Sequence, residues 1–434
     1  MMTLALPDTR VANRLGIHER FVRSTLWLAC FLLATLTATP FPNLGDPRLL
    51  DPVGDGNRLG QILVIVLTLA LSVFLMAKAR WAFVRALTLA MVLTLAWFFV
   101  TAIVSAHSDL ALRRLVLAVF TVINAIAFLV LPSDREHFGR LLVTGSLIIL
   151  AISYLGVLLL PHLSIHQLSD VIESALAGAW RGPFGHKNGA GSMMVVLIFI
   201  GIFVVRTVNL ITGLIIITGA TVFLSFTWSK SPIGLLPLVL LLSFVLLRLR
   251  SAPARYALVI GSVVIANLLT VGTVTIEPLG KLIAAMGSDA SYTGRDEIWE
   301  FAIDHTLRKP ITGYGFQAFW GTGSLLFNWD VNESWGLRAS DAHNGYLNIA
   351  VMTGLVGLAL TLVWAVLQPL RDLSATSRNS IDPPLTTLFL QIWIFGLLLS
   401  SVESVLFSGG DALWLLMIAS IVGLRLQRVS QLAR

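Results

Sequence analysis

Long apolar runs dominate this chain and constrain its fold more than any other feature. Twelve runs approach the roughly 20 residues that an α-helix needs to cross a bilayer. They occupy approximately residues 24–39, 59–77, 86–105, 114–132, 141–160, 189–205, 208–227, 232–248, 256–273, 346–368, 385–402 and 411–425. Only 12% of the 434 residues are charged and the mean hydropathy is +0.85, which argues against a soluble enzyme. We therefore predict an all-α polytopic membrane protein with about 12 transmembrane helices.

Polar segments divide these predicted spans into five parts. Residues 1–160 hold transmembrane helices 1–5, 161–188 form a periplasmic loop, and 189–273 hold helices 6–9. Residues 274–345 form a long periplasmic loop with short helices, and 346–434 hold helices 10–12 and a cytoplasmic tail. No small-residue cleavage site follows the first run, so we interpret it as a span rather than a signal peptide.

Lysine and arginine are distributed unevenly between the two sides of the predicted membrane. With the N-terminus in the cytoplasm, 18 of the 30 basic residues are cytoplasmic, and only seven lie on the other side outside the long loop. Because positive charge accumulates on the cytoplasmic side, both termini are predicted to be cytoplasmic. The same distribution explains the net charge of +7 better than nucleic-acid binding does.

Several of the outer basic residues lie at the very ends of spans, where they oppose this orientation signal. They are Arg48, Arg58, Arg113, Arg114, Arg181, Lys187 and Lys230, with Lys281, Arg295, Arg308, Lys309 and Arg338 in the long loop. Two interpretations stay open. The side chains either snorkel to lipid phosphates or hold an anion.

The long outer loop is the most polar part of the chain. Residues 294–310 place Ile298, Phe301, Ala302 and Leu307 at the spacing of one apolar helix face, and the pattern ends at residues 308–310, which predicts a short amphipathic helix. Tryptophans in this loop either anchor it at the membrane interface or provide a stacking platform for sugar rings. They are Trp299, Trp320, Trp329 and Trp335.

Histidines also concentrate on the outer side, which holds six of the eight: His107, His162, His166, His186, His305 and His343. Because imidazole accepts a proton near neutral pH, one of the six is a candidate general base. His162 and His166 are spaced for one helix face, but further ligands for a zinc site are not evident. We predict no metal and no cofactor.

Other chemistries find no support in the sequence. The single cysteine, Cys30, excludes a disulfide framework and is interpreted as inert packing. Neither a phosphate-binding loop nor a dinucleotide-binding glycine pattern is present, so ATP hydrolysis and nicotinamide chemistry are not indicated.

Four short patterns stand beside the outer ends of spans. The first is His343-Asn344, followed after nine residues by Gly354-Leu355-Val356-Gly357. The second begins with Gly294-Arg295-Asp296-Glu297-Ile298-Trp299 and continues with Pro310 and Gly313-Tyr314-Gly315. The third is Arg181-Gly182-Pro183-Phe184-Gly185-His186-Lys187-Asn188, and the fourth is Ser229-Lys230-Ser231.

Together these patterns resemble the O-antigen ligase superfamily, which includes O-antigen polymerases, exopolysaccharide polymerases and protein O-oligosaccharyltransferases. The resemblance covers roughly residues 140–420, and the third pattern is most similar to exopolysaccharide polymerases of the succinoglycan type. In the fourth pattern the family usually has arginine where this chain has Lys230, which keeps the charge but loses the bidentate fork. The resemblance implies a GT-C-like architecture with the long loop between spans nine and ten.

The resemblance also implies an activity and a site. The activity is transfer of a glycan from undecaprenyl pyrophosphate to an acceptor sugar hydroxyl at the periplasmic face, without a metal. The implied catalytic residues are His343, as the general base, and Arg295. Arg181, Lys187 and Lys230 would bind the pyrophosphate, and Asn344, His186, Asn188, Gly354 and Gly357 would support the site. Whether Arg113 and Arg114 join the phosphate site, and whether Asp341 tunes His343, stays open.

The acceptor distinguishes the remaining alternatives. A lipid-linked repeat as acceptor makes the protein an exopolysaccharide polymerase, which we favour, whereas a lipid A core makes it an O-antigen ligase. A transporter of lipid-linked saccharide is the alternative of another class, but polar residues concentrated at the outer face favour chemistry there. The predicted location is the bacterial inner membrane. The predicted partners are the lipid-linked donor, the saccharide acceptor, membrane lipids, and polysaccharide export and chain-length proteins, with no nucleic acid.

Overall fold

The computed structural model describes residues 16–46, 58–171, 173–285, 294–322, 339–376, 382–409 and 411–432. Its helices are α2 (Ile17–Leu36), α3 (Arg58–Lys78), α4 (Arg80–Ala86), α5 (Leu89–Ile103), α6 (Ser108–Val130), α7 (Arg135–Leu159), α8 (Pro161–Ser164), η2 (Ser174–Leu176), α9 (Lys187–Thr207), α10 (Leu210–Thr227), α11 (Lys230–Arg248), α12 (Ala252–Leu268), α13 (Gly272–Thr275), α14 (Glu277–Ala285), α15 (Arg295–Arg308), α18 (Gly345–Leu362), η3 (Val363–Leu367), α19 (Gln368–Ala375), α20 (Pro383–Leu399) and α21 (Ala412–Leu432).

These ranges contain no β-strand beyond an isolated bridge between Ile165 and Trp180, so the predicted all-α class is confirmed. Eight of the described helices are long and apolar enough to cross a bilayer, and the bent pair α4–α5 adds a ninth if it is one span. The helices α12 and α20 are apolar but only 17 residues long. The chain is therefore a polytopic membrane protein, whereas the count of twelve spans and the division into five parts stay predictions.

The helices differ sharply in how much of their surface the protein covers. In α21 and α9, 83% and 72% of the most apolar window is buried, against 17% in α3. A helix that is apolar on all sides and half-uncovered must face an apolar solvent, because water would penalise that surface. The exposed side of α3 is therefore lipid-facing, and α9 and α21 form the centre of the bundle.

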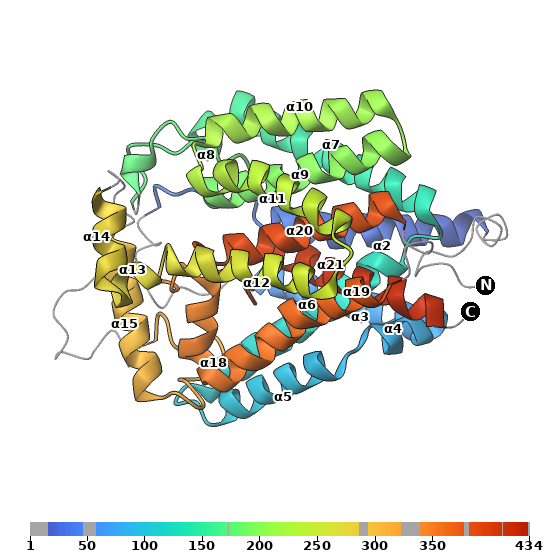
Figure 1. Cartoon of the computed structure of the whole chain (residues 1–434). Coiled ribbons are helices and arrows are strands. Elements are labelled where there is room, and N and C mark those ends of the chain that lie inside the picture. Colours follow the sequence, from blue (N-terminus) through green and yellow to red (C-terminus); the bar gives the residue numbers. More distant parts are fainter. Residues whose placement is uncertain are drawn as a thin grey trace.

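The two ends of the bundle are distinct (Figure 1). The N- and C-terminal parts lie at one end, and α14 and α15 run across the opposite end. This agrees with termini on one side and the long loop on the other. That the termini face the cytoplasm stays a prediction. Arg48, Trp329, Trp335 and Arg338 lie outside the described residues.

The helix expected in the long loop is confirmed as α15, but the burial predicted for one of its residues is wrong. Ile298 and Ala302 are buried as the spacing predicted, but Leu307 is 69% exposed. Trp299 is fully buried, and its Nε1 donates to the carbonyl of Ala342 at 3.0 Å. For this tryptophan the two interpretations, interface anchor and sugar platform, are wrong. It holds α15 against the segment that leads into α18.

A break in α18 joins the first two sequence patterns. Gly354 adopts φ 71° and ψ 177°, which interrupts the helical hydrogen bonds. Segment 310–315 fills the gap: two of its N–H groups donate to the carbonyls of residues 351 and 352 at 3.1 and 2.8 Å. Its first carbonyl accepts from the N–H of Leu355 at 2.7 Å. The Pro-x-x-Gly-x-Gly stretch and the Gly-x-x-Gly stretch are therefore two halves of one backbone junction.

Both glycines of the first pattern have close neighbours. A Cβ on Gly354 would collide with the carbonyl of Ile311, and a Cβ on Gly357 would collide with the side chain of Thr353 and lie 3.2 Å from Trp97. The Trp97 indole in turn donates to the Thr353 carbonyl at 2.9 Å. These contacts support the predicted packing role of both glycines beneath the outer end of α18.

We expect Gly354→Ala to destabilise the protein strongly. The backbone conformation alone costs a non-glycine residue about 1–3 kcal/mol, and the collision with segment 310–315 adds to this. Thermal unfolding in detergent should shift down by several degrees. The control is Gly261→Ala in α12, where a Cβ meets nothing within 4 Å. Equal melting temperatures for the two variants would contradict this account of the junction.

Candidate active site

Glu403, in the turn after α20, is the point where all four sequence patterns meet. Its Oε1 accepts hydrogen bonds from Arg295 Nη2 at 3.0 Å and from Asn188 Nδ2 at 2.9 Å. Its Oε2 lies 3.5 Å from Nδ1 of His343. Asn188 also accepts a hydrogen bond from Ser229 Oγ at 2.8 Å. We call these five residues the Glu403 cluster.

His343 enters the cluster from a constrained turn. Its φ is 45°, in the left-handed region, and its N–H donates to Asp341 Oδ1 at 2.7 Å, which stabilises that turn. The Nδ1 atom lies 3.8 Å from the same Asp341 oxygen and 3.5 Å from Glu403. These are ion-pair distances rather than well-formed hydrogen bonds. The side chain is 32% exposed, so the ring faces two carboxylates and remains accessible.

Asn344 fixes the backbone on which His343 stands. It is the N-cap of α18, and its Oδ1 accepts from the N–H of Leu347 at 2.9 Å. Its Nδ2 donates to Asn267 Oδ1 and to the Ser401 carbonyl, both at 3.0 Å. One amide thus joins the end of α12, the start of α18 and the turn that carries Glu403.

The charges in the cluster shift the titration of its members. Burial alone would raise the pKa of Glu403, but the facing His343 imidazole and the charge of Arg295 outweigh it and hold the pKa well below its usual range. Burial alone would lower the pKa of His343, yet Glu403 and Asp341 outweigh burial and the opposing Arg295, so the pKa is raised. Glu403 therefore stays ionised, and the imidazole is a stronger base than an ordinary histidine.

Two lysines begin adjacent helices close to the cluster. Lys187 opens α9 and Lys230 opens α11, and the two helices touch where a Cβ on Gly191 would lie 2.8 Å from Ser229 Cβ. Lys187 Nζ donates to the Trp228 carbonyl at 3.3 Å. A cation at a helix N-terminus opposes the helix dipole, and a bound anion would relieve both.

His186 is occupied at both ring nitrogens. Its Nδ1 accepts from the N–H of Asn188 at 3.1 Å, which caps α9, and its Nε2 lies 2.8 Å from Glu173 Oε2. The first contact requires an unprotonated Nδ1, so the proton is on Nε2. His166 is similar, with Nδ1 3.0 Å from Asp170 and Nε2 accepting from the Lys187 N–H at 3.3 Å. Both histidines position the start of α9.

Arg181 is not brought to the exposed face with the lysines. Its side chain is fully buried, and its guanidinium donates to the carbonyls of Phe184 at 3.0 Å and Pro42 at 2.8 Å. In this arrangement it holds the loop before α9, and its role as a phosphate ligand stays a prediction without support from the geometry. Arg114 donates to the Gln317 carbonyl and so contacts the loop after α15.

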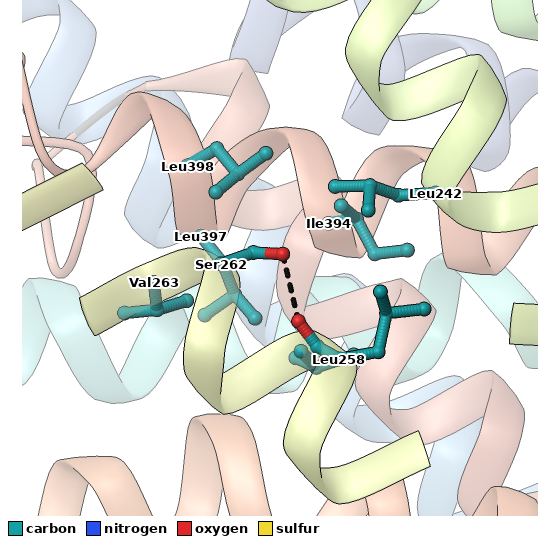
Figure 2. Close-up of a pocket in the computed structure, with 8 residues that line it drawn as sticks. Leu242, Leu258, Ser262, Val263, Ile394, Leu397 and Leu398 are labelled. Carbon is teal, nitrogen blue, oxygen red and sulfur yellow. Dashed lines mark hydrogen bonds between the residues drawn. The ribbon is translucent and has the colours of Figure 1, made fainter. Parts of the chain in front are cut away.

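Figure 2 shows a crevice elsewhere in the bundle, between α11, α12 and α20. It is lined by Leu242, Leu258, Val259, Ser262, Val263, Ile394, Leu397 and Leu398. Its one polar side chain, Ser262, donates to the Leu258 carbonyl at 2.7 Å within the same helix. With no ionisable group among these residues, the crevice offers no acid, base or charge for chemistry.

Glu403 is the residue that the sequence analysis missed. A signal was present, because it is an acidic residue at the outer end of the apolar run 385–402, on the side where the unexplained cations lie. A partly buried cation such as Arg295 is stabilised by a counter-charge. Spacing alone did not pair them, because they are 108 positions apart.

Comparison with known proteins agrees with the resemblance over part of the chain. Residues 213–362 match the O-antigen ligase family. A stretch of 145 residues is 30% identical to the exopolysaccharide production protein ExoQ of Rhizobium meliloti (strain 1021) and covers 31% of this chain. The alignment spans about a third of that relative, 32% of its length. The family match includes Ser229, Arg295 and His343, whereas Asn188 and Glu403 lie outside it.

We expect Glu403→Gln to lower the pKa of His343. Glu403 favours the imidazolium, so removing its charge makes the proton leave at lower pH. The pH dependence of diethyl pyrocarbonate modification, read by mass spectrometry on the peptide with His343, measures the midpoint. Asp304→Asn is the control, because Asp304 pairs with the exposed Arg308 at 2.7 Å. A midpoint that stays fixed or rises in Glu403→Gln would contradict the assigned contact.

Proposed function

We propose that this protein is a membrane glycosyltransferase that moves a glycan from undecaprenyl pyrophosphate to an acceptor sugar hydroxyl at the periplasmic face. We further propose that it polymerises exopolysaccharide repeat units in the bacterial inner membrane. The observation that carries the proposal is the Glu403 cluster, which joins a candidate base, His343, to a guanidinium, Arg295. The similarity to the O-antigen ligase family and to ExoQ supports the same class of substrate.

The proposed reaction is a single displacement. The acceptor hydroxyl oxygen attacks the anomeric carbon of the donor glycan, the bond from that carbon to the phosphate oxygen breaks, and the lipid pyrophosphate leaves as an anion. His343 takes the proton of the attacking hydroxyl. Attack from the face opposite the pyrophosphate inverts the anomeric centre. A pyrophosphate is a stable leaving group, so the base contributes more than an acid would.

Positive charge would stabilise the departing pyrophosphate. Arg295 is 18% exposed, and its fork offers five donors, of which two are engaged by Glu403 and the Val402 carbonyl. Lys187 and Lys230 add charge at the helix ends nearby. In the proposed mechanism these side chains, rather than a metal ion, neutralise the negative charge that develops on the leaving pyrophosphate.

A ligase that joins polysaccharide to lipid A core is the second candidate. The matched family bears the ligase name, which favours it, whereas the exopolysaccharide relative favours a polymerase. Both reactions use the same displacement and differ only in the acceptor. A transporter of the same saccharide would bind it near the middle of the membrane, whereas the Glu403 cluster is formed by turns and helix ends.

Replacement of His343 by alanine should abolish most of the transfer. Loss of a general base costs about 10²- to 10⁴-fold in rate. In a strain that depends on this protein, high-mass polysaccharide should disappear while the single lipid-linked repeat accumulates. His162→Ala is the matched control, since His162 is an exposed histidine in the loop before α9. Wild-type amounts of polysaccharide from the His343→Ala strain would contradict the proposed enzyme and favour the transporter.

Purified protein in lipid nanodiscs should transfer saccharide from the lipid-linked repeat in the presence of EDTA at the rate measured without it. The reason is that protein cations, rather than a divalent ion, are proposed to neutralise the leaving group. Chromatography of the products measures the rate, and the Arg295→Ala variant should lose it in both conditions. A rate that falls with EDTA and recovers with magnesium or manganese would contradict the metal-free mechanism.

A further inference from the structure

A cavity of about 550 Å³ lies beside the Glu403 cluster. Among the residues that the structure describes, its lining comes from α2, α3, α6, α18 and α21 and the turns next to them, and none comes from α9 or α11. It includes Asp341, two residues from His343, and Ser404, which follows Glu403. The cavity therefore adjoins the cluster through Asp341, whose Oδ1 accepts from the His343 N–H at 2.7 Å, although no member of the cluster is among the described lining residues. Its volume is within the range of about 300–1,000 Å³ that is usual for small-molecule sites.

The lining combines apolar side chains, such as Leu33, Val64 and Leu117, with polar ones, and the polar ones fit a neutral, polyhydroxylated ligand. Two carboxyl groups, Asp341 and Asp411, are opposed by one guanidinium, Arg114, which already donates to the Gln317 carbonyl. An anionic ligand such as a phosphate would meet at least as much negative as positive charge there. An acyl chain would bury these polar groups without partners, at a cost. Hydroxyl groups of a sugar satisfy both carboxylates and amides, because each hydroxyl donates and accepts.

An aromatic and amide pair stands on the α18 side of the cavity. Trp320 Nε1 donates to Asn348 Oδ1 at 2.6 Å, which leaves the two N–H donors of the Asn348 amide for another partner. Trp320 is 7% exposed, and the part of its indole that lines the cavity offers a sugar an apolar contact. Two further lining residues, Asn124 and Ser404, have side-chain oxygens that are buried with no hydrogen-bond partner in the described parts of the chain.

The environment of Asp411 disfavours its charged form. Burial raises the pKa of Asp411, the N–H of Leu413 opposes that shift, and the charge of Glu403 adds to it. Asp411 Oδ1 accepts from the Leu413 N–H at 2.8 Å, which fixes the group at the start of α21.

We propose that this cavity is the binding site for the acceptor saccharide, with Asp341, Asn348, Trp320 and Asp411 as its recognition residues. The assignment of the saccharide as the acceptor rests on the proposed function. This proposal divides the site into a donor part and an acceptor part. The cations at the starts of α9 and α11 take the donor pyrophosphate, and the carboxyl, amide and indole groups take the sugar whose hydroxyl reacts. His343 stands between the two halves.

The test is saccharide binding, measured apart from transfer. The probe is the repeat-unit oligosaccharide released by mild acid from the polysaccharide of the native strain and labelled with a fluorophore at its reducing end. Fluorescence anisotropy with purified protein in nanodiscs gives the Kd. Thr121→Trp fills the cavity from α6, and Asn348→Leu removes the amide with little change in volume. Val116→Trp is the matched control, because Val116 lies on α6 and is 49% exposed.

The expected result is that Thr121→Trp and Asn348→Leu weaken binding at least tenfold. Val116→Trp and His343→Ala should bind within twofold of the wild-type protein, and His343→Ala should still lose transfer. Wild-type affinity in both cavity variants, with normal elution on size-exclusion chromatography, would overturn the inference. If the wild-type protein binds the saccharide but transfers no glycan, the proposed function is overturned. Loss of binding in the cavity variants would in that case still support a saccharide site.

Discussion

The arrangement of the outer end of this protein depends on one partly buried carboxylate. Glu403 lies between Arg295, Asn188 and His343, and each of these comes from a different part of the chain. Removing either member of the Arg295–Glu403 pair leaves the other partly buried charge without compensation. The turn after α20, the start of α9, the start of α15 and the turn before α18 are therefore held in one geometry by one side chain.

A second constraint is a backbone junction rather than a charge. Gly354 interrupts α18, and the segment that follows α15 supplies the missing hydrogen-bond partners. At the other end of α15, Trp299 is bound to the carbonyl of Ala342. The long loop is thus attached to α18 on both sides of His343, which keeps the imidazole at a fixed place relative to the bundle end. Rigid support of this kind is what a general base requires.

The polar groups around His343 are not distributed evenly. Lys187 and Lys230 stand at the starts of two helices that carry none of the cavity lining, whereas Asp341 and Asp411 belong to the cavity. This asymmetry matches the proposed glycosyl transfer, in which the donor reacts at its diphosphate and the acceptor at a hydroxyl group.

Hydropathy and spacing are read along the chain, and they determined the all-α membrane class, the polar loop between apolar runs and the helix that became α15. The resemblance in four short patterns selected His343 and Arg295, which the structure brings to the same carboxylate. Only the tertiary structure decided that Glu403 joins them, that Arg181 is buried beneath the loop, and that Trp299 belongs to the core. Those outcomes depend on contacts between helices far apart in sequence, and a one-dimensional pattern carries no information on which spans become neighbours or which side of a residue faces them.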